Sequence, residues 1–120
     1  MKRVWTDDNK FQNWLKVELA ACEAWTEMGV IPQQDMVKLR RATLNPERLA
    51  FHLKETHHDV TAFLRAVGET IGEESRFIHL GMTSSDVMDT AQSLQILQAI
   101  AILEDDVDKL LAAISTLAVK

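Results

Sequence analysis

The sequence predicts an all-α protein, and three observations support this prediction. Glycine and proline are scarce, with 4 and 2 of the 120 residues, and the residue types that dominate the chain favour helix. No stretch of useful length alternates apolar and polar residues as a strand would. The segment from Ser85 to Lys120 contains neither glycine nor proline and repeats its apolar residues at helical spacing.

Two helices are predicted in the first third of the chain. Thr6 can cap the first, which ends before Gly29, a residue suited to the left-handed conformation that follows many helices. The apolar residues of this helix recur at helical spacing at Phe11, Trp14, Leu15, Leu19, Cys22 and Trp25. A second, shorter helix is expected from Pro32 to about Ala42.

Two further helices are predicted between residues 45 and 72. Asn45 is a suitable cap and Pro46 a suitable first residue for the third helix, which runs towards Glu55. The fourth helix stops at Gly72. Its apolar residues are Val60, Phe63, Leu64, Val67 and Ile71.

The long C-terminal segment carries a heptad pattern. Its apolar residues are spaced alternately by four and three at Ile96, Ile100, Leu103, Val107, Leu110, Ile114 and Leu117. A second apolar stripe consists of Val87, Ala91, Leu94, Leu97 and Ala101. Roughly 35 helical residues span on the order of 50 Å, whereas a compact domain of this length is about 35 Å across. We expect the helix to extend beyond its own domain, either in an oligomer or, because no stop signal closes it, in a longer bundle protein.

Composition and charge exclude several classes of protein. The net charge of -5 and the lack of a clustered basic face argue against nucleic-acid binding. The single cysteine, Cys22, cannot form an internal disulfide and fits a reducing compartment. No run of 18 apolar residues predicts a membrane span, and Met1–Arg3 is not followed by the apolar region of a signal peptide. We therefore expect a cytoplasmic protein.

The long helix begins with an unusually polar segment. Continued towards the N-terminus, the heptad positions hold Ser93, Asp89 and Asp86 in place of apolar residues. Residues 83–86, TSSD, can form a capping box with an aspartate in place of the usual glutamate, at a helix end that emerges into solvent. The alternative is that the free N–H groups and hydroxyls bind an anion. Both interpretations remain open at this point.

A second polar cluster, THHD at residues 56–59, lies at the start of the fourth helix. Adjacent histidines face different directions on a helix, so His57 and His58 are not predicted to share a metal ion. They are either exposed surface residues or include a histidine that titrates near neutrality and is oriented by Asp59. His79 is a third candidate of this kind, whereas His52 is expected on a solvated helix face.

Read together, these segments resemble the adenylosuccinate lyases of the fumarase/aspartase superfamily. The resemblance covers essentially the whole chain and rests on WTDDNKFQNWLKVELAACEAWTEMGVIP, HHDVTAFLRAV and RFIHLGMTSSDVMDTAQSLQ. TSSDVMDTA is shared across the superfamily, whereas HDVTAF is the more specific element. The resemblance implies an all-α protein in which residues 1–82 form an N-terminal helical domain and residues 83–120 begin the central bundle domain of a homotetramer.

The resemblance also implies a reaction, the elimination of fumarate from adenylosuccinate to give AMP and from the succinyl-carboxamide intermediate of purine synthesis, without a cofactor or metal. His58 would have a supporting catalytic role, and Asp86 would complete the second motif. The residues placed at the substrate site are His57, His58, Asp59, Thr83, Ser84 and Ser85. The principal catalytic histidine and serine of the family belong to THG-type and SSxMPxKxN-type motifs that this sequence lacks, so we expect the 120-residue chain alone to be inactive.

Two other functions are compatible with parts of the sequence. A non-enzymatic helical assembly module would use the heptad pattern but would not need His58 to meet the hydroxyls of residues 83–84. A cycloisomerase of the same superfamily would carry a similar TSSD segment but is disfavoured by HDVTAF.

Overall fold

The computed structural model describes residues 1–119, and within that range it contains helices and no strands. The prediction of an all-α protein is therefore confirmed. In chain order the elements are η1 (Lys2–Trp5), α1 (Asp7–Glu27), α2 (Gln33–Leu39), α3 (Pro46–Thr56), α4 (Asp59–Ile71), η2 (Gly72–Phe77) and α5 (Ser84–Ala118).

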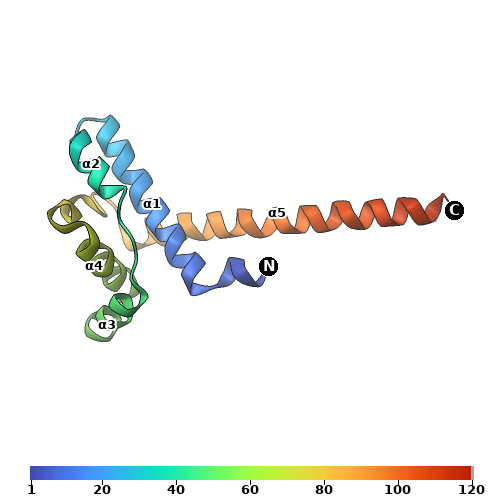
Figure 1. Ribbon diagram of the computed structural model, residues 1–120, viewed down its shortest axis with the longest axis horizontal. Helices are drawn as coiled ribbons and strands as arrows, with labels where there is room; N and C mark the ends of the chain where they lie inside the picture. Colours follow the sequence, from blue (N-terminus) through green and yellow to red (C-terminus); the bar gives the residue numbers. More distant parts are fainter. Residues whose placement is uncertain (120) are drawn as a thin grey trace.

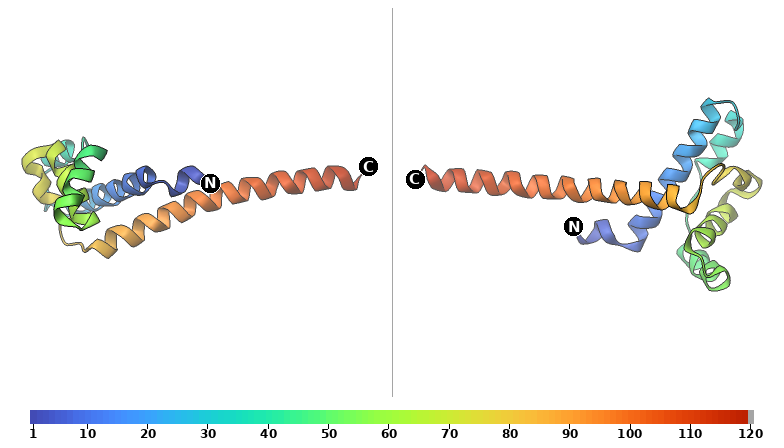
Figure 2. Two further views of the ribbon diagram at one scale, coloured as in Figure 1. Left: turned by 90° about the horizontal axis from the view of Figure 1, so that it is seen from below. Right: turned by 180° about the vertical axis from the view of Figure 1, so that it is seen from behind.

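The molecule consists of a head, formed by α1 to α4, and a single long helix that projects from it (Figures 1 and 2). Its principal extents are 67 × 36 × 22 Å and its radius of gyration is 19.0 Å. A compact domain of this length would have a radius of gyration of about 14 Å. The predicted extension of the last helix beyond its own domain is confirmed.

Local signals account for most helix boundaries. The Thr6 side chain accepts a hydrogen bond from the backbone N–H of Asn9 at the start of α1, and Asn45 caps α3 in the same way. Gly29 follows α1 with a φ of +78°, which glycine adopts without steric cost. The second helix ends at Leu39, earlier than the predicted Ala42, and the two 3₁₀ segments were not predicted.

The larger core cluster joins α1, α4 and the first turns of α5. An aromatic group lies at its centre, with the Trp14 ring centroid 5.0 Å from that of Phe11 and 5.5 Å from that of Phe63. Val87 and Ala91 bring α5 onto this cluster and are fully buried. The head and the beginning of α5 therefore share one core.

A smaller core cluster lies where α1 meets α2. It consists of Cys22, Ile31, Met36 and Leu39. Cys22 is 1 % exposed, as expected for a small apolar residue, and burial raises the pKa of its thiol to about 11. The thiol is therefore protonated and chemically quiet at neutral pH.

Polar side chains set the register between α1 and α5. The Asn9 amide donates to Gln98 Oε1 at 2.7 Å, and the Gln98 amide donates to Asn13 Oδ1 at 3.3 Å. Gln95 is buried and donates to the backbone carbonyl of Val4 at 2.8 Å. A shift of α5 by one residue would leave these buried polar groups unpaired, which is costly, so the pairs favour one alignment.

The buried face of α5 is short. It follows a spacing of four residues at Val87, Ala91, Gln95 and Ala99. Of the second apolar stripe, Val87 and Ala91 pack onto the head, whereas Leu97, which is 62 % exposed, and Ala101 do not. From residue 100 to residue 119 no residue of α5 is buried.

The heptad residues of α5 are exposed along the whole helix, with Leu103 at 53 % and Leu117 at 71 %. A shallow groove lies on this face between Ile100 and Asp108. Within residues 1–119, no helix combines the length and apolar character needed to cross a membrane.

Candidate functional site at the beginnings of α1, α4 and α5

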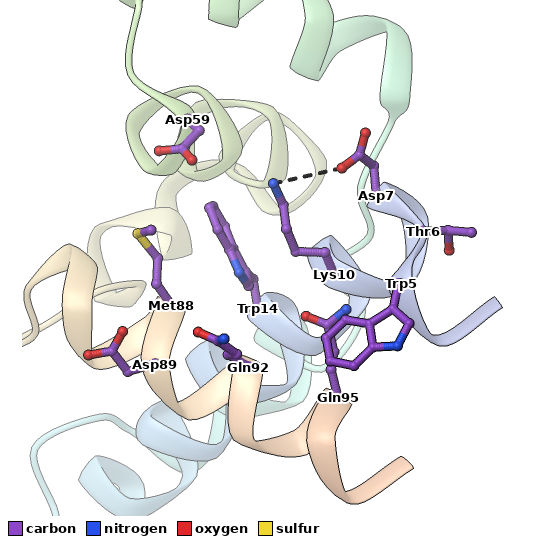
Figure 3. A pocket seen from close by; sticks show the side chains of 10 residues that line it. All are labelled: Trp5, Thr6, Asp7, Lys10, Trp14, Asp59, Met88, Asp89, Gln92 and Gln95. Carbon is purple, nitrogen blue, oxygen red and sulfur yellow. Dashed lines mark ion pairs between the residues drawn. The ribbon is translucent and has the colours of Figure 1, made fainter. Parts of the chain in front are cut away.

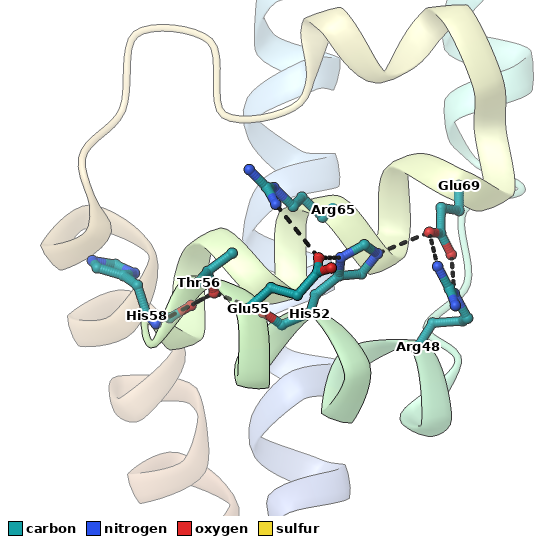
Figure 4. Close-up of polar contacts among 7 residues, drawn as sticks. All are labelled: Arg48, His52, Glu55, Thr56, His58, Arg65 and Glu69. Atoms are coloured by element: carbon teal, nitrogen blue, oxygen red, sulfur yellow. Dashed lines mark hydrogen bonds and ion pairs between the residues drawn. The ribbon is translucent and has the colours of Figure 1, made fainter.

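The first predicted cluster forms the junction between α3 and α4. His57 closes α3 in a left-handed conformation with a φ of +51°, and its side chain is exposed. His58 caps α4, since its Nδ1 accepts a hydrogen bond from the backbone N–H of Thr61 at 3.3 Å. Thr56 supports the turn by accepting a hydrogen bond from the His58 backbone N–H (Figure 4). His57 therefore lies at the end of α3, and His58 lies at the start of α4.

The cap has a chemical consequence for His58. A nitrogen that accepts a hydrogen bond carries no proton, so the neutral imidazole of His58 has its proton on Nε2. The side chain is 53 % exposed, and Asp59 Oδ1 lies 3.9 Å from Nδ1. His58 therefore presents Nε2 as a hydrogen-bond donor on the surface.

The second predicted cluster begins α5. The backbone N–H of Thr83 donates to Asp86 Oδ2 at 2.7 Å, which is one of the two bonds of the predicted capping box. The side chains of Ser84 and Ser85 make no hydrogen bond to any residue in the range 1–119. Their hydroxyls and the first N–H groups of a 35-residue helix are available to a ligand.

A cavity of about 270 Å³ lies where α1, α4 and α5 meet, and Figure 3 shows the side chains that line it. These residues are Trp5, Thr6, Asp7, Lys10, Trp14, Asp59, Met88, Asp89, Gln92 and Gln95. Asp59 is the member of the predicted set that lines it. The hydroxyls of residues 83–85 lie one turn before Met88 and Asp89 and do not line this cavity.

Lys10 supplies the positive charge in the wall of this cavity and was not identified from the sequence. Its ammonium lies 3.8 Å from Asp7 Oδ1, 4.5 Å from the ring centroid of Phe11 and 5.2 Å from that of Trp14. Asp7, Lys10 and Asp59 also line a neighbouring, more apolar cavity of about 380 Å³ between α1 and α3. The spacing of Asp7 and Lys10 along a helix was the available signal, but it is typical of any solvated helix face.

His79 has an unpredicted partner, Glu18. The Glu18 side chain is fully buried on α1, and its Oε1 lies 2.7 Å from His79 Nδ1 while its Oε2 accepts the backbone N–H of His79 at 2.8 Å. Burial raises the pKa of Glu18, and the hydrogen bonds from His79 oppose that shift. The sequence signal for Glu18 was a charged residue on the apolar stripe of its helix, between Leu15 and Leu19.

The prediction for His52 was wrong. This residue is 8 % exposed, and its Nε2 lies 2.8 Å from Glu69 Oε1 because α3 packs directly on α4 along this face (Figure 4). Arg48 donates to both carboxylate oxygens of Glu69, at 2.7 and 2.6 Å. The Arg48 hydrogen bonds, followed by that of His52, lower the pKa of Glu69 to about 2. His52 does not line the cavity that holds Asp59.

Comparisons with known proteins were consistent with one another. A family model described as "Lyase" matches residues 1–120. The adenylosuccinate lyase of Bacillus subtilis (strain 168) is 49 % identical over 110 residues, which cover 91 % of this chain and 26 % of that protein. The chain thus spans about a quarter of the length of that relative.

Among solved structures, the fold is similar to that of a fumarate lyase from Mesorhizobium sp. BNC1, with a TM-score of 0.78 and 22 % identity over 89 % of this chain and 26 % of that one. This likeness concerns the fold. The family match extends over every residue of the sequence, and the chain therefore belongs to the lyase family.

Proposed function

We propose that the protein is an adenylosuccinate lyase, a C–N lyase that eliminates fumarate from adenylosuccinate to give AMP and from the succinyl-carboxamide ribotide of purine biosynthesis. The observation that carries the proposal is the 49 % identity over 110 residues to the enzyme of that name. On this proposal residues 1–82 are the N-terminal helical domain and residues 83–120 the start of the central bundle domain. A cytoplasmic location fits the buried free thiol of Cys22.

The proposed roles follow from the chemistry of elimination. A base must take a proton from carbon, an acid must protonate the leaving nitrogen, and donors must hold the carboxylates and the phosphate. His58 suits the binding of substrate or the delivery of a proton, since its Nε2 is a donor. His57 and Asp59 border it, and Thr83, Ser84 and Ser85 offer hydroxyls and N–H groups at the positive end of α5.

The charge of the cavity supports a site completed by other parts of an assembly. Its walls hold the carboxylates of Asp7, Asp59 and Asp89 against the ammonium of Lys10. A nucleotide with a phosphate and two carboxylates needs more positive charge than this. We propose that the additional groups come from neighbouring subunits in a homotetramer, which forms through the exposed heptad face of α5.

A replacement experiment tests the proposal. The matching segment of the Bacillus subtilis enzyme is exchanged for this chain, and fumarate release from adenylosuccinate is followed. We expect the chimera to cleave adenylosuccinate, and the 120-residue chain alone to release no fumarate. A chimera that assembles as the parent enzyme does but releases no fumarate would overturn the proposal. Turnover of carboxymuconate in its place would favour the cycloisomerase.

Variants of the chimera test the individual roles. His58→Asn and Ser84→Ala should each lower kcat/KM by at least about tenfold, because each removes a hydrogen bond to a charged substrate, while asparagine can still cap α4. Lys54→Gln is the matched control, since Lys54 is exposed on α3 and makes no ion pair within residues 1–119. Unchanged kinetics in both site variants would remove these residues from the site, and would leave an assembly role for the heptad face.

A further inference from the structure

The connector between η2 and α5 is held by one face of α1. Glu18 bonds to His79 through both carboxylate oxygens, the thiol of Cys22 lies 3.5 Å from the Phe77 carbonyl oxygen, and the indole of Trp25 donates to the Leu80 carbonyl at 2.9 Å. These three side chains are spaced by four and three residues, so they share one side of the helix. The side chains on this one face of α1 therefore hold the connector that leads into α5.

His79 has an unusual backbone conformation within this connector. Its φ is +66°, in the left-handed region that few residues other than glycine adopt. A histidine there is strained, and such strain persists where the surroundings impose it and often lies at functional sites. Its backbone N–H donates to Glu18 Oε2 at 2.8 Å, and its carbonyl accepts from the backbone N–H of Met82 at 3.3 Å, so both backbone groups of His79 are held.

The second oxygen of Glu18 acts on the imidazole ring. The two hydrogen bonds from His79 favour the ionised form of Glu18 against the effect of burial. With Glu18 ionised, its Oε1 can only accept, so the ring nitrogen 2.7 Å away, Nδ1, carries the proton. In the neutral ring Nε2 is then unprotonated. It has no hydrogen bond to any residue of the range 1–119, and the His79 side chain remains 20 % exposed. Holding the His79 backbone requires only one acceptor, which is Oε2 of Glu18. Oε1 therefore has a separate effect, which is to set the tautomer of the His79 ring.

We propose that Glu18 is a positioning residue that acts through His79, keeping the ring proton on Nδ1 so that Nε2 accepts a hydrogen bond or a proton from the substrate beside the start of α5. The inference rests on the proposed lyase function for its substrate. It extends that function to a residue that lies outside both sequence motifs. His79 and His58 then present opposite properties, an acceptor Nε2 and a donor Nε2.

The test begins with the 120-residue chain labelled with ¹⁵N-histidine, in which ring nitrogen shifts report the tautomer. His79→Asn assigns the His79 signals, because asparagine tolerates a left-handed conformation. We expect the proton on Nδ1 in the unmodified chain. In Glu18→Gln the amide oxygen must accept the His79 backbone N–H, which leaves the amide NH₂ facing Nδ1 and moves the ring proton to Nε2. Glu18→Asp retains two acceptors and should keep the proton on Nδ1.

An unchanged tautomer in Glu18→Gln, with the helix content preserved, would overturn the proposal, as would a proton on Nε2 in the unmodified chain. The functional part uses the chimera described above. Glu18→Gln should lower kcat by at least about tenfold with a smaller change in KM, and Glu18→Asp should recover part of the loss.

Glu23→Gln is the matched control, since Glu23 is exposed on the same helix and pairs only with Arg40 in the part of the chain that the structure describes. An active chimera that is unaffected by Glu18→Gln would refute the positioning role and leave the lyase function intact. A chimera that assembles as the parent enzyme does but is inactive before any substitution would refute the lyase function, and the tautomer measurement would still decide the role of Glu18.

Discussion

The indole of Trp25 and the backbone of Leu80 are joined by a hydrogen bond of 2.9 Å, and the next residue, Gly81, lies against the indole ring. A Cβ atom at Gly81 would approach Trp25 Cζ2 to 3.2 Å. Gly81 also has a φ of +75°. The path of the chain into α5 therefore depends on a residue without a side chain.

Gly81→Ala should destabilise the chain by more than about 1 kcal/mol, because alanine is strained at positive φ and its methyl group would press on the indole. Gly29→Ala is the control, since Gly29 has a φ of +78° and open space around its Cα. Thermal unfolding followed by circular dichroism should show the larger loss for Gly81→Ala. Equal losses would mean that contact with Trp25 carries no cost.

Glu69 should make stability depend on pH in the acid range. Its pKa is lowered to about 2 in the folded chain, so its contribution is complete above the unfolded value near 4.5 and is lost as the pH falls from there towards 2. Glu69→Gln should reduce the melting temperature at pH 7 and remove part of the acid dependence. Glu73→Gln, at an exposed carboxylate on η2, should leave both unchanged. If the melting temperatures of Glu69→Gln and of the unmodified chain changed by the same amount between pH 6 and pH 2, this account would be contradicted.

Asp86 should stabilise the first turn of α5. Asp86→Ala removes the acceptor for the Thr83 backbone N–H and a negative charge near the positive end of the helix, which together are worth about 1 kcal/mol. Asp106→Ala removes an exposed charge from the middle of the same helix and is the control. Hydrogen exchange of the amides of residues 87–91, the first that are bonded within the helix, should accelerate in Asp86→Ala alone, and equal exchange in the two variants would contradict the assigned cap.

The exposed apolar face of α5 should drive self-association. Leu110 is 59 % and Ile114 52 % exposed, and a contiguous apolar stripe of this kind is typical of an interaction surface. Sedimentation velocity should show concentration-dependent association of the chain, which Leu110→Asn with Ile114→Asn should weaken. Asp106→Asn, on the same helix, should have no effect. A monomer at every concentration, before any substitution, would show that the face does not pair with itself.

Much of the fold was predictable because the signals that define it are local. Thr6 and Asn45 mark helix starts by their capping chemistry, and Gly29 and Gly72 mark helix ends. The 3₁₀ segments were missed because one or two turns are too short to show a periodic pattern. The sequence did not indicate the burial of Gln95 on α5, because an apolar pattern does not reveal a polar residue at a buried position.

The candidate site was less predictable because it depends on contacts between distant segments. The motifs marked Asp59, but nothing in the sequence indicated that it shares a cavity with Lys10, since that depends on the packing of α1 against α4 and α5. His52 was misjudged because its burial comes from the neighbouring helix and not from its own. Glu18 was overlooked because an acidic residue on a helix is usually solvated, and only its pairing with His79 makes its burial tolerable.

The thiol of Cys22 lies beneath the connector, against the Phe77 carbonyl, with a pKa raised to about 11. The thiolate attacks alkylating reagents, and therefore the rate at which such a reagent modifies this cysteine at neutral pH reports how often the surrounding segments, including the connector, open. Since the sequence holds one cysteine, no mutagenesis or added label is required. Cys22 is thus a natural probe for the opening of the connector before α5. A ligand that binds at the start of α5 and holds the connector closed would slow the modification of Cys22.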